Sequence, residues 1–459
     1  MVTGSMVTPS RFPTEIIDFV HDTQLDDLPE DVVGWARRCV LDLLGVAAAG
    51  RSTELSAIIH DHAARHFGAG EGPSASMIFD GRAVSPAGAA LAGGMTIDSI
   101  DAHDGHKITK GHTGCHQLPA LLALTEAEGR DDAGEFLTAL IVGYEFATRA
   151  GIALHATAPD YHTSGAWGSV GVAALGARVL DLSPAKTWEA MGIGEYHGPR
   201  SQMMRVIDHP TMLKDGSGWG AMAGVSAAYL AADGFTGAPA ITVCDPAVEH
   251  VWSDLGERWV IFDQYFKPYP VCRWAQPAVE AALSVCQGAT FESEQVASIQ
   301  VTTFHEAARL ATALPATTEH AQYSLPFPVA AAVARGRLGA TEVTAESLAD
   351  PELRRLAAAV TIDEDPAHNA AFPGNRFARV VVELVDGRRY ESEDHEPRGD
   401  PEDHLDDAEI RAKFHRFADP VLGATLAARI ESAVDRLGSG DSLGNLRSLI
   451  SAGASAPMH

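Results

Sequence analysis

Apolar residues recur every three or four positions from about residue 13 to residue 265, and this spacing predicts a series of helices. In residues 30–50, which follow Pro29, the apolar stripe consists of Val32, Trp35, Ala36, Cys39, Val40, Leu43 and Leu44. One face of this helix is therefore expected to be buried. Residues 131–151 repeat the pattern, with Asp131 or Asp132 as the helix cap.

Two further helical segments, residues 169–182 and 220–237, are dominated by alanine and glycine. Their helices are expected to pack closely against their neighbours, inside a helical domain rather than on its surface. Residues 396–414 are acidic, as is typical of a helix start, and the tail from 420 to 450 is again predicted to be helical.

The apolar period becomes alternating after Tyr269. Residues 296–304 and 377–391 alternate apolar and polar positions, as strands do, and the second run contains an Asp-Gly turn. The inward positions of the two strands are predicted to be Ile299, Val301, Thr303, Ala378, Val380, Val382 and Leu384.

These patterns predict a mainly α protein with two domains. Helices at about 275–286 and 326–335 lie between the two strands, which makes this part of the chain an α+β unit. We expect residues 11–267 and 396–450 to form one large all-helical domain built from both chain ends. Residues 268–395 are expected to form a smaller α+β lid domain inserted in it.

Composition narrows the classes of partner. The chain has 459 residues and a formal net charge of -27, so it should repel nucleic acids and anionic membrane surfaces. A small anionic substrate requires a local group of cations that reverses this field. The five cysteines are widely spaced and lack a C-x-x-C pair, which argues against a disulfide framework or a structural zinc site. We expect a cytoplasmic protein that binds neither nucleic acid nor membrane.

Residues 96–116, TIDSIDAHDGHKITKGHTGCH, hold four of the 20 histidines together with three aspartates. A polar loop is solvated by default, but this one is flanked by apolar helical segments, which favours the lining of a cavity. One interpretation is a divalent metal site of the metal-dependent phosphohydrolase kind, in which an upstream histidine joins the His103-Asp104 dyad. Two lysines within the same stretch would place positive charge beside such an ion.

The other interpretation is proton transfer without a metal, because histidine takes and returns a proton near neutral pH. Removing a proton beside a carboxylate builds negative charge that cationic side chains must stabilise. Candidate partners lie in three distant segments: YHTSGAWGS with His162, HPTMLKDGSGWGAMAG with Lys214, and FKPYPVCRWAQPAVEA with Lys267, Cys272 and Arg273.

Taken together, these segments resemble the MmgE/PrpD family, which includes 2-methylcitrate dehydratase, cis-aconitate decarboxylase and iminodisuccinate epimerase. The likeness runs in order through VLDLLGVAAAG, VGYEFATRAG, LKDGSGWGAMAG, GFTGAPA, KPYPVCRW and AQYSLPFPVAAAVARG to the late Asp-Gly hairpin. The resemblance implies a helical domain with an inserted lid and a homodimer. It also implies a cofactor-free site between the domains that acts on small di- or tricarboxylates.

The resemblance also assigns residues. Asp98 and Asp101 match the acids of the first family motif, His112 closes that motif, and Cys272 stands where decarboxylase-like members carry another histidine. We predict as catalytic residues Asp98, His112, His162, Lys214 and Lys267. We predict as substrate-binding residues Asp101, His103, His106, Lys107, Arg205, Cys272 and Arg273. No residue is assigned as a metal ligand, and no cofactor is expected.

Several positions depart from the family pattern. Ala102 stands where a hydroxyl residue is common, and Thr113 stands where proline is usual. Gln276 and Phe327 occupy positions where histidine and tyrosine are frequent. The chain is therefore expected to be a divergent member of the family.

The resulting hypothesis is a cofactor-independent lyase, a dehydratase or a decarboxylase. Lys214 and Lys267, with Arg205 or Arg273, would hold substrate carboxylates, while a histidine removes the proton alpha to one of them. Return of the proton to the opposite face would make the protein an epimerase. A metal-dependent phosphohydrolase and a catalytically inactive carboxylate-binding protein are the remaining alternatives.

Overall fold

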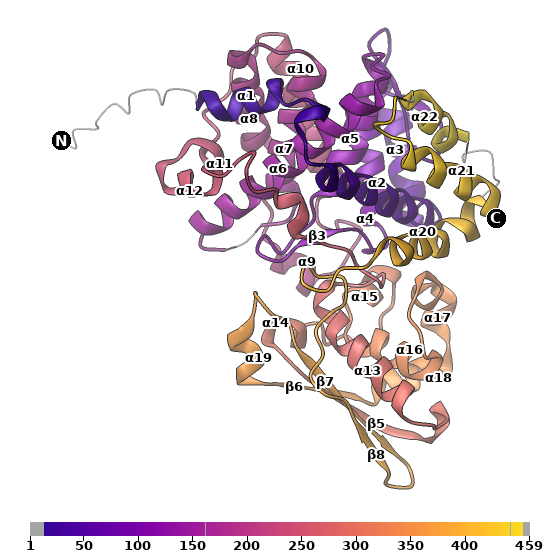
Figure 1. Ribbon diagram of the computed structural model, residues 1–459. Coiled ribbons are helices and arrows are strands. Elements are labelled where there is room, and N and C mark those ends of the chain that lie inside the picture. Colours follow the sequence, from indigo (N-terminus) through magenta and orange to yellow (C-terminus); the bar gives the residue numbers. More distant parts are fainter. Residues whose placement is uncertain (1–12, 161, 441, 453–459) are drawn as a thin grey trace.

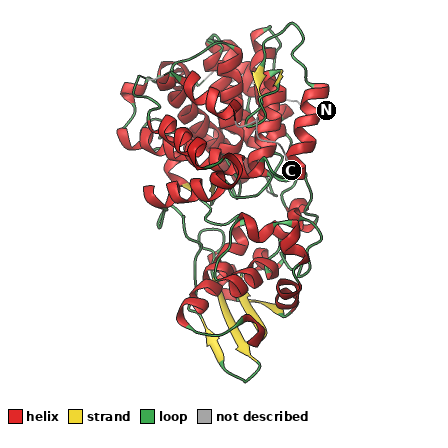
Figure 2. Ribbon diagram, turned by 90° about the vertical axis from the view of Figure 1, so that its right-hand side faces the viewer, coloured by secondary structure: helices red, strands yellow, loops and turns green. Residues whose placement is uncertain are grey.

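The computed structural model describes residues 13–160, 162–440 and 442–452. It has two unequal lobes, a larger one made almost entirely of helices and a smaller one that combines helices with a sheet (Figure 1, Figure 2). The sequence continues through the larger lobe, enters the smaller lobe and returns to the larger one. The predicted fold class, mainly α with an inserted α+β unit, is therefore confirmed. The exact domain boundaries stay a prediction.

The first part of the chain supplies most of the larger lobe. Its helices are α1 (Thr14–Asp22), α2 (Glu30–Gly50), α3 (Glu54–His66), α4 (Pro86–Asp98), α5 (Gly114–Ala127), α6 (Ala133–Thr157), α7 (Gly165–Val179), α8 (Pro184–His197), α9 (Met204–Asp208), α10 (Ser217–Ala232), α11 (Ile241–Cys244) and α12 (Glu249–Trp252). Two small antiparallel ladders pair β1 (Ala75–Ser76) with β2 (Ala83–Val84), and β3 (Gly105–His106) with β4 (Gln264–Tyr265). The end of the chain adds α20 (Asp407–Leu422), α21 (Ala424–Asp435) and α22 (Leu443–Ala452).

Helix α2 is buried more completely than its apolar stripe predicts. Every residue from Cys39 to Gly50 is buried, Asp42 included, because α4, α6 and the returning helix α20 surround this half of the helix. Close approach of α20 depends on Gly45, where an added Cβ would lie 3.1 Å from Phe414. The expectation of a single buried face holds only for the first half of α2.

The Ala- and Gly-rich helices α7 and α10 pack closely, as predicted. The expectation that both lie away from the surface is wrong for α10, because Trp219 and Leu230 are exposed. A Cβ added at Gly224 of α10 would lie 2.4 Å from the Cβ of Val172 in α7, so a larger residue cannot be accommodated there.

Helix α6 begins after Asp132, whose carboxylate accepts the Gly134 and Glu135 amides, and it is the one described helix long and apolar enough to cross a membrane. Because 94% of its most apolar window is buried inside the protein, α6 fits a core helix.

The smaller lobe is built around one four-stranded sheet of order β6-β5-β7-β8. Its strands are β5 (Val296–Thr303), β6 (Val360–Glu364), β7 (Ala378–Leu384) and β8 (Arg389–Glu391). Its helices are α13 (Gln276–Gly288), α14 (His305–Ala308), α15 (Thr318–Gln322), α16 (Pro326–Arg335), α17 (Ala345–Ala349), α18 (Pro351–Ala358) and α19 (Pro366–Ala371). Figure 2 shows helices of this lobe packed over the sheet.

The sheet matches the predicted strand faces. Val301 of β5 lies opposite Val380 of the antiparallel neighbour β7 and opposite Ile362 of the parallel neighbour β6. All seven predicted inward positions are buried. Strand β6 was not predicted from the sequence, and its two apolar residues Val360 and Ile362 are only half-buried. The lobe's core also includes Met203, Val206 and Ile207 from the α9 region, so the chain before the lid contributes to it.

Candidate functional site

Six of the predicted site residues meet at one buried point between the lobes, which we call the ionic cluster. Its members are Asp98, Asp101, His103, His112, Lys214 and Lys267, and none is more than 6% exposed. Asp98 ends α4, the next three residues lie on the loop between α4 and α5, Lys214 precedes α10, and Lys267 follows β4. Segments that are distant in the sequence therefore supply two cations, two carboxylates and two imidazoles.

Two cluster residues adopt left-handed backbone conformations. Asp101 has φ 51° and Lys214 also has φ 51°, among only five described residues other than glycine with positive φ. A side chain in this region costs roughly 1–2 kcal/mol, so the surrounding structure must hold it there. Such residues concentrate at functional sites, which agrees with the position of this cluster.

Asp101 and Lys267 form the central ion pair. The Lys267 Nζ lies 2.5 Å from Asp101 Oδ1 and 3.0 Å from the Asp101 carbonyl oxygen. Burial alone would raise the pKa of Asp101, but the Lys267 and Lys214 ammonium groups together lower it below its ordinary value. The carboxylate is therefore ionised and neutralises one of the two lysines.

The two histidines are held neutral. His112 Nδ1 lies 2.5 Å from the Asp104 carbonyl oxygen, and because a carbonyl only accepts, Nδ1 carries the proton and Nε2 keeps a free lone pair. Burial and then the charge of Lys267 lower the pKa of His112 to about 3. The His103 ring lies 4.2 Å from that of His112, centroid to centroid, and burial lowers its pKa well below the ordinary value.

Asp98 is the second carboxyl group of the cluster. Its Oδ2 accepts the Ser217 hydroxyl at 2.6 Å and the Asp215 amide at 3.1 Å, whereas Oδ1 has no hydrogen-bond partner among the described residues. Burial raises the pKa of Asp98, and the nearby Lys214 opposes this. The unbonded Oδ1 lies 3.8 Å from His103 Nε2, so this carboxyl group can exchange a proton with a ligand or with the imidazole.

The lid contributes Gln322 and Tyr323, which received no role from the sequence. Gln322 Oε1 accepts from Lys214 Nζ at 2.5 Å, and its Nε2 donates to the Ser99 carbonyl at 3.0 Å. The Lys214 Nζ also lies 4.7 Å from the centre of the Tyr323 ring. The only signal in the sequence was that this polar Gln-Tyr pair precedes the apolar residues of α16. The segment was used as part of the family resemblance, and no residue in it was assigned a role.

Cys272 lies beside the cluster. Its amide donates to the Gln322 carbonyl at 2.7 Å, and burial raises the pKa of its thiol to about 12. The residue therefore contributes a neutral thiol and a backbone contact to the lid segment.

Two predicted residues lie elsewhere on the surface. His162 is half-buried, its ring stacks on His155 at 6.5 Å between centroids, and its amide donates to His155 Nε2. The charged groups that act on His162 are Arg200 and Asp160, not members of the ionic cluster. Arg205 is exposed on α9. The structure thus separates both residues from the cluster that was expected to contain them.

Lys107 and Arg273 form a separate ion network. Arg273 donates to Asp400 Oδ1 at 2.5 Å and also to the carbonyl oxygens of two residues before Asp400. Lys107 Nζ lies 3.0 Å from Asp400 and 2.8 Å from Glu402. These pairings connect Lys107 and Arg273 to residues 397–402, where the chain returns from the smaller lobe to the larger one. Neither cation is therefore free to bind a substrate carboxylate.

His106 also lies apart from the cluster. It belongs to β3, its Nδ1 accepts from the Thr109 amide at 3.3 Å, and its Nε2 lies 4.0 Å from Asp263. Burial lowers the pKa of His106 to about 3, so the ring is a neutral part of the core.

A metal fits the cluster poorly. Asp101, His103 and His112 offer ligand atoms within 4.8 Å of one another, the one such group among the described residues. However, the Lys267 ammonium already lies 2.5 Å from Asp101 Oδ1 and would repel a cation there. The His103-Asp104 dyad does not supply a second ligand either. The Asp104 carboxylate already accepts hydrogen bonds from the Tyr144 hydroxyl, at 2.5 Å, and from the Gly114 amide.

The comparisons with known proteins agree with the sequence resemblance. The chain is 25% identical to the cis-aconitate decarboxylase-like protein oryM of Aspergillus oryzae, over 95% of this chain and 96% of that one. It is 23% identical to the cis-aconitate decarboxylase of Mus musculus, over 91% and 89% of the two chains, and 23% identical to that of Homo sapiens, over 88% and 87%. The MmgE/PrpD N-terminal domain matches residues 14–251 and the C-terminal domain matches residues 269–439. Since the two matches cover most of the sequence, the chain belongs to the MmgE/PrpD family.

Proposed function

We propose that the protein is a cofactor-independent lyase that removes carbon dioxide or water from a small di- or tricarboxylate at the ionic cluster. The observation that carries the proposal is the meeting of Lys214 and Lys267 with a neutral imidazole whose Nε2 is unprotonated. The relatives named above support a lyase that acts on a carboxylate, at 23% to 25% identity.

The lysines bind the substrate. A carboxylate takes the place of the Gln322 amide at Lys214, and a second carboxylate competes with Asp101 for Lys267. In a buried site of low dielectric, each such contact stabilises developing negative charge by roughly 3 kcal/mol. Burial and then the charge of Lys267 lower the pKa of His112, and a bound anion opposes the second of these effects, so it shifts the pKa upward.

The imidazole of His112 then transfers the proton. In dehydration, Nε2 takes the proton alpha to a bound carboxylate, the C–H electron pair forms the new double bond, and the beta hydroxyl leaves as water. Asp98, whose pKa is raised by burial, supplies the proton of that water. In decarboxylation, the C–C bond breaks, its electron pair stays on the substrate and carbon dioxide leaves. The carboxyl group of Asp98, whose pKa is raised by burial, then donates its proton to the carbon that carries the electron pair.

Two alternatives remain distinguishable. An epimerase at the same site would return the proton to the opposite face without loss of a group. A metal-dependent phosphohydrolase has less support, because Lys267 lies where its ion would bind and Asp104 points away from His103. A chelator should leave the activity of the lyase unchanged, whereas the phosphohydrolase would lose activity and recover it with Mn²⁺ or Zn²⁺.

The test is an NMR screen in deuterated water with citrate-like, aconitate-like and aspartate-derived acids. We expect loss of water or carbon dioxide from one of them, with deuterium at the reacting carbon. His112→Gln should reduce turnover roughly 10²- to 10⁴-fold while the melting temperature stays near that of the native protein. Turnover that survives in His112→Gln and disappears in His162→Gln would show that the base is assigned to the wrong histidine.

A further inference from the structure

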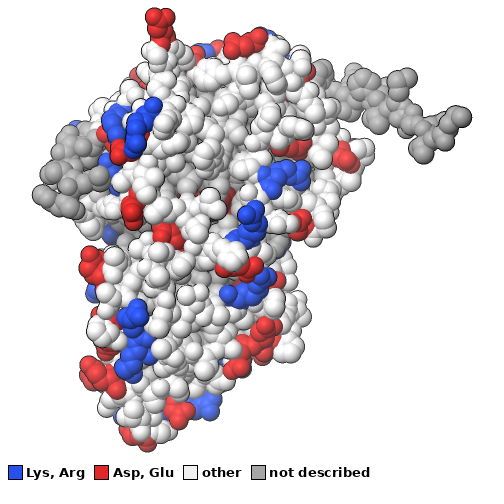
Figure 3. Space-filling view, turned by 180° about the vertical axis from the view of Figure 1, so that it is seen from behind, with Lys and Arg blue, Asp and Glu red and all other residues white. Residues whose placement is uncertain are grey.

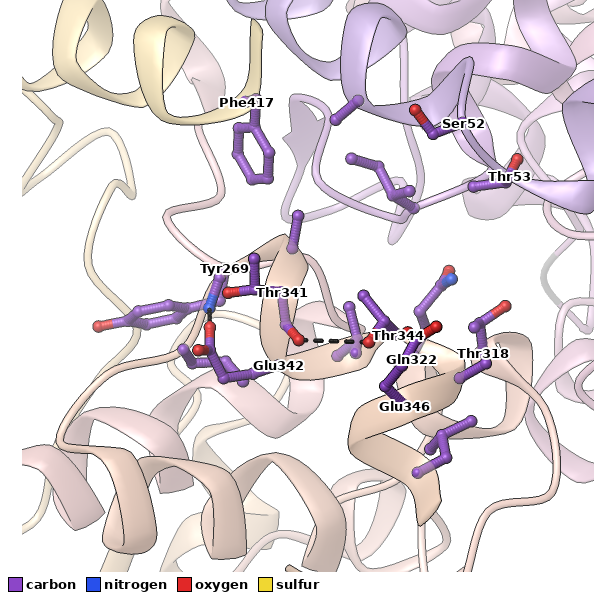
Figure 4. A pocket seen from close by; sticks show the side chains of 18 of the residues that line it. Ser52, Thr53, Tyr269, Thr318, Gln322, Thr341, Glu342, Thr344, Glu346 and Phe417 are labelled. Carbon is purple, nitrogen blue, oxygen red and sulfur yellow. Dashed lines mark hydrogen bonds between the residues drawn. The ribbon is translucent and has the colours of Figure 1, made fainter. Parts of the chain in front are cut away.

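A large cleft opens between the two lobes directly beside the ionic cluster. Its volume is about 990 Å³. Ser52, Thr53 and Phe417 of the larger lobe face the lid segment 341–346 across it (Figure 4). A cleft of this size is at the upper end of pockets that hold small molecules and exceeds what a short tricarboxylate needs.

The cleft is connected to the ionic cluster through Gln322, although no residue of the cluster lines the cleft itself. Gln322 and Ile100 line the cleft, and both are at most 6% exposed. The Gln322 side chain reaches from there to Lys214 and to the Ser99 carbonyl. If a substrate carboxylate displaces the Gln322 amide from Lys214, the rest of the substrate molecule extends toward the cleft.

The charges of the cleft do not suit a carboxylate. Four glutamates line it, Glu54, Glu319, Glu342 and Glu346, against two arginines. Of the arginines, Arg337 is paired with Glu342 at 3.0 Å and Arg416 donates to the Pro268 carbonyl. The cleft thus lacks a surplus cation among its lining residues, in contrast to the cluster below it.

The remaining surface of the cleft is largely apolar. Ala49 and Ile100 come from the larger lobe, and Leu283, Val343 and Leu348 come from the lid. Apolar walls with surplus negative charge favour a neutral hydrocarbon group, which gains from leaving water and experiences no repulsion.

We propose that this cleft is a subsite for an alkyl extension of the substrate, so that the substrate is a di- or tricarboxylate bearing a hydrocarbon chain. The carboxylates bind Lys214 and Lys267, and the chain extends past Ile100 and Gln322 into the cleft. This inference rests on the proposed function, since it names the substrate class of the same site.

The experiment compares a series of alkyl-substituted tricarboxylates, from methyl to hexyl, as substrates of the full-length protein. We expect kcat/KM to rise roughly two- to fourfold for each methylene that the cleft takes up. Ala345→Trp, which fills the cleft, should lower the ratio of kcat/KM for hexyl over methyl substrates at least tenfold. Ala349→Trp, on the same helix α17 but outside the cleft, is the matched control and should leave that ratio unchanged.

The outcomes separate the two proposals. Turnover of methyl and hexyl acids with equal kcat/KM overturns the subsite while the lyase stands. If none of the acids is turned over, the lyase fails, and the subsite is judged by binding alone. Hexylsuccinate must then raise the melting temperature more than succinate does, and Ala345→Trp must remove that difference. Equal shifts for both acids overturn the subsite.

Discussion

Buried ionisable side chains dominate this protein at the residue scale. Burial raises the pKa of Asp104 to about 7 even though the Tyr144 hydroxyl donates to its carboxylate. Burial lowers the pKa of both His112 and His106 to about 3. Burial thereby favours the uncharged form of each of these three groups, whereas Lys214, Lys267 and Asp101 are charged members of the ionic cluster.

Asp104→Asn should change how stability depends on pH. Because the folded-state pKa of Asp104 is raised, its stabilising contribution is complete below the unfolded pKa of 3.8 and is lost as the pH rises toward about 7. That loss is about 1.4 kcal/mol per pH unit for one group. Urea denaturation should show that the variant gains stability relative to the native protein between pH 4 and pH 7. The exposed Asp18→Asn is the control, and parallel curves for all three proteins would contradict the expectation.

At the scale of elements, the returning helix α20 holds the loop that carries the cluster. Lys413 of α20 lies 2.5 Å from Asp42 of α2, and its Nζ donates to the Ala102 carbonyl at 2.7 Å. All three groups are buried, and burial raises the pKa of Asp42 and lowers that of Lys413. One lysine near the end of the chain therefore joins the first large helix to the site loop.

Removing one partner of this ion pair should cost more than removing both. Lys413→Met leaves Asp42 buried and unpaired, which should lower the free energy of unfolding by about 3–5 kcal/mol. Adding Asp42→Asn to the same chain should recover a substantial part of that loss, because no buried charge is then left unpaired. Denaturant unfolding of the two single variants and the double variant measures the coupling. Additive losses would show that the two side chains do not stabilise each other.

At the scale of the whole molecule, the distribution of charge bears on assembly. Figure 3 shows a broad central area of the larger lobe that is nearly free of Lys, Arg, Asp and Glu, although the net charge is -27. Separately, the outward side of α10 carries Trp219, 41% exposed, and Leu230, 38% exposed, with half-buried Met222 between them. Exposed apolar helix faces are typical of contacts between proteins, so we propose a homodimer that uses α10.

A charge placed on this face should separate the dimer. Trp219→Glu combined with Leu230→Glu should halve the mass measured by light scattering, because two carboxylates per subunit would be buried in the contact. Leu314→Glu, at a lid leucine that is 46% exposed, is the control and should keep the mass of the native protein. A native protein that already has the mass of one chain would refute the proposed homodimer.

The sequence by itself determined the long helices, two strands of the larger sheet and most of the cluster. Helical and alternating periods are local properties, so α6, α10 and the strand faces of β5 and β7 were predicted from neighbouring residues alone. The family resemblance supplied positions that no spacing rule supplies, and the structure brings five of them together, namely Asp98, Asp101, His112, Lys214 and Lys267. His103, the sixth residue of the cluster, was predicted from the His-rich loop.

Only the tertiary structure decided which polar groups are neutralised and which remain free for a ligand. Arg273 and Lys107 are paired with Asp400, a residue more than 100 positions away from either, and Gln322 reaches Lys214 from the other lobe. Such pairings depend on which distant segments meet and on how much water they exclude. The periodicity of apolar residues depends on neighbours along the chain, so it indicates only that a side chain faces inward. The partner of a buried charge depends on the packing of the whole fold.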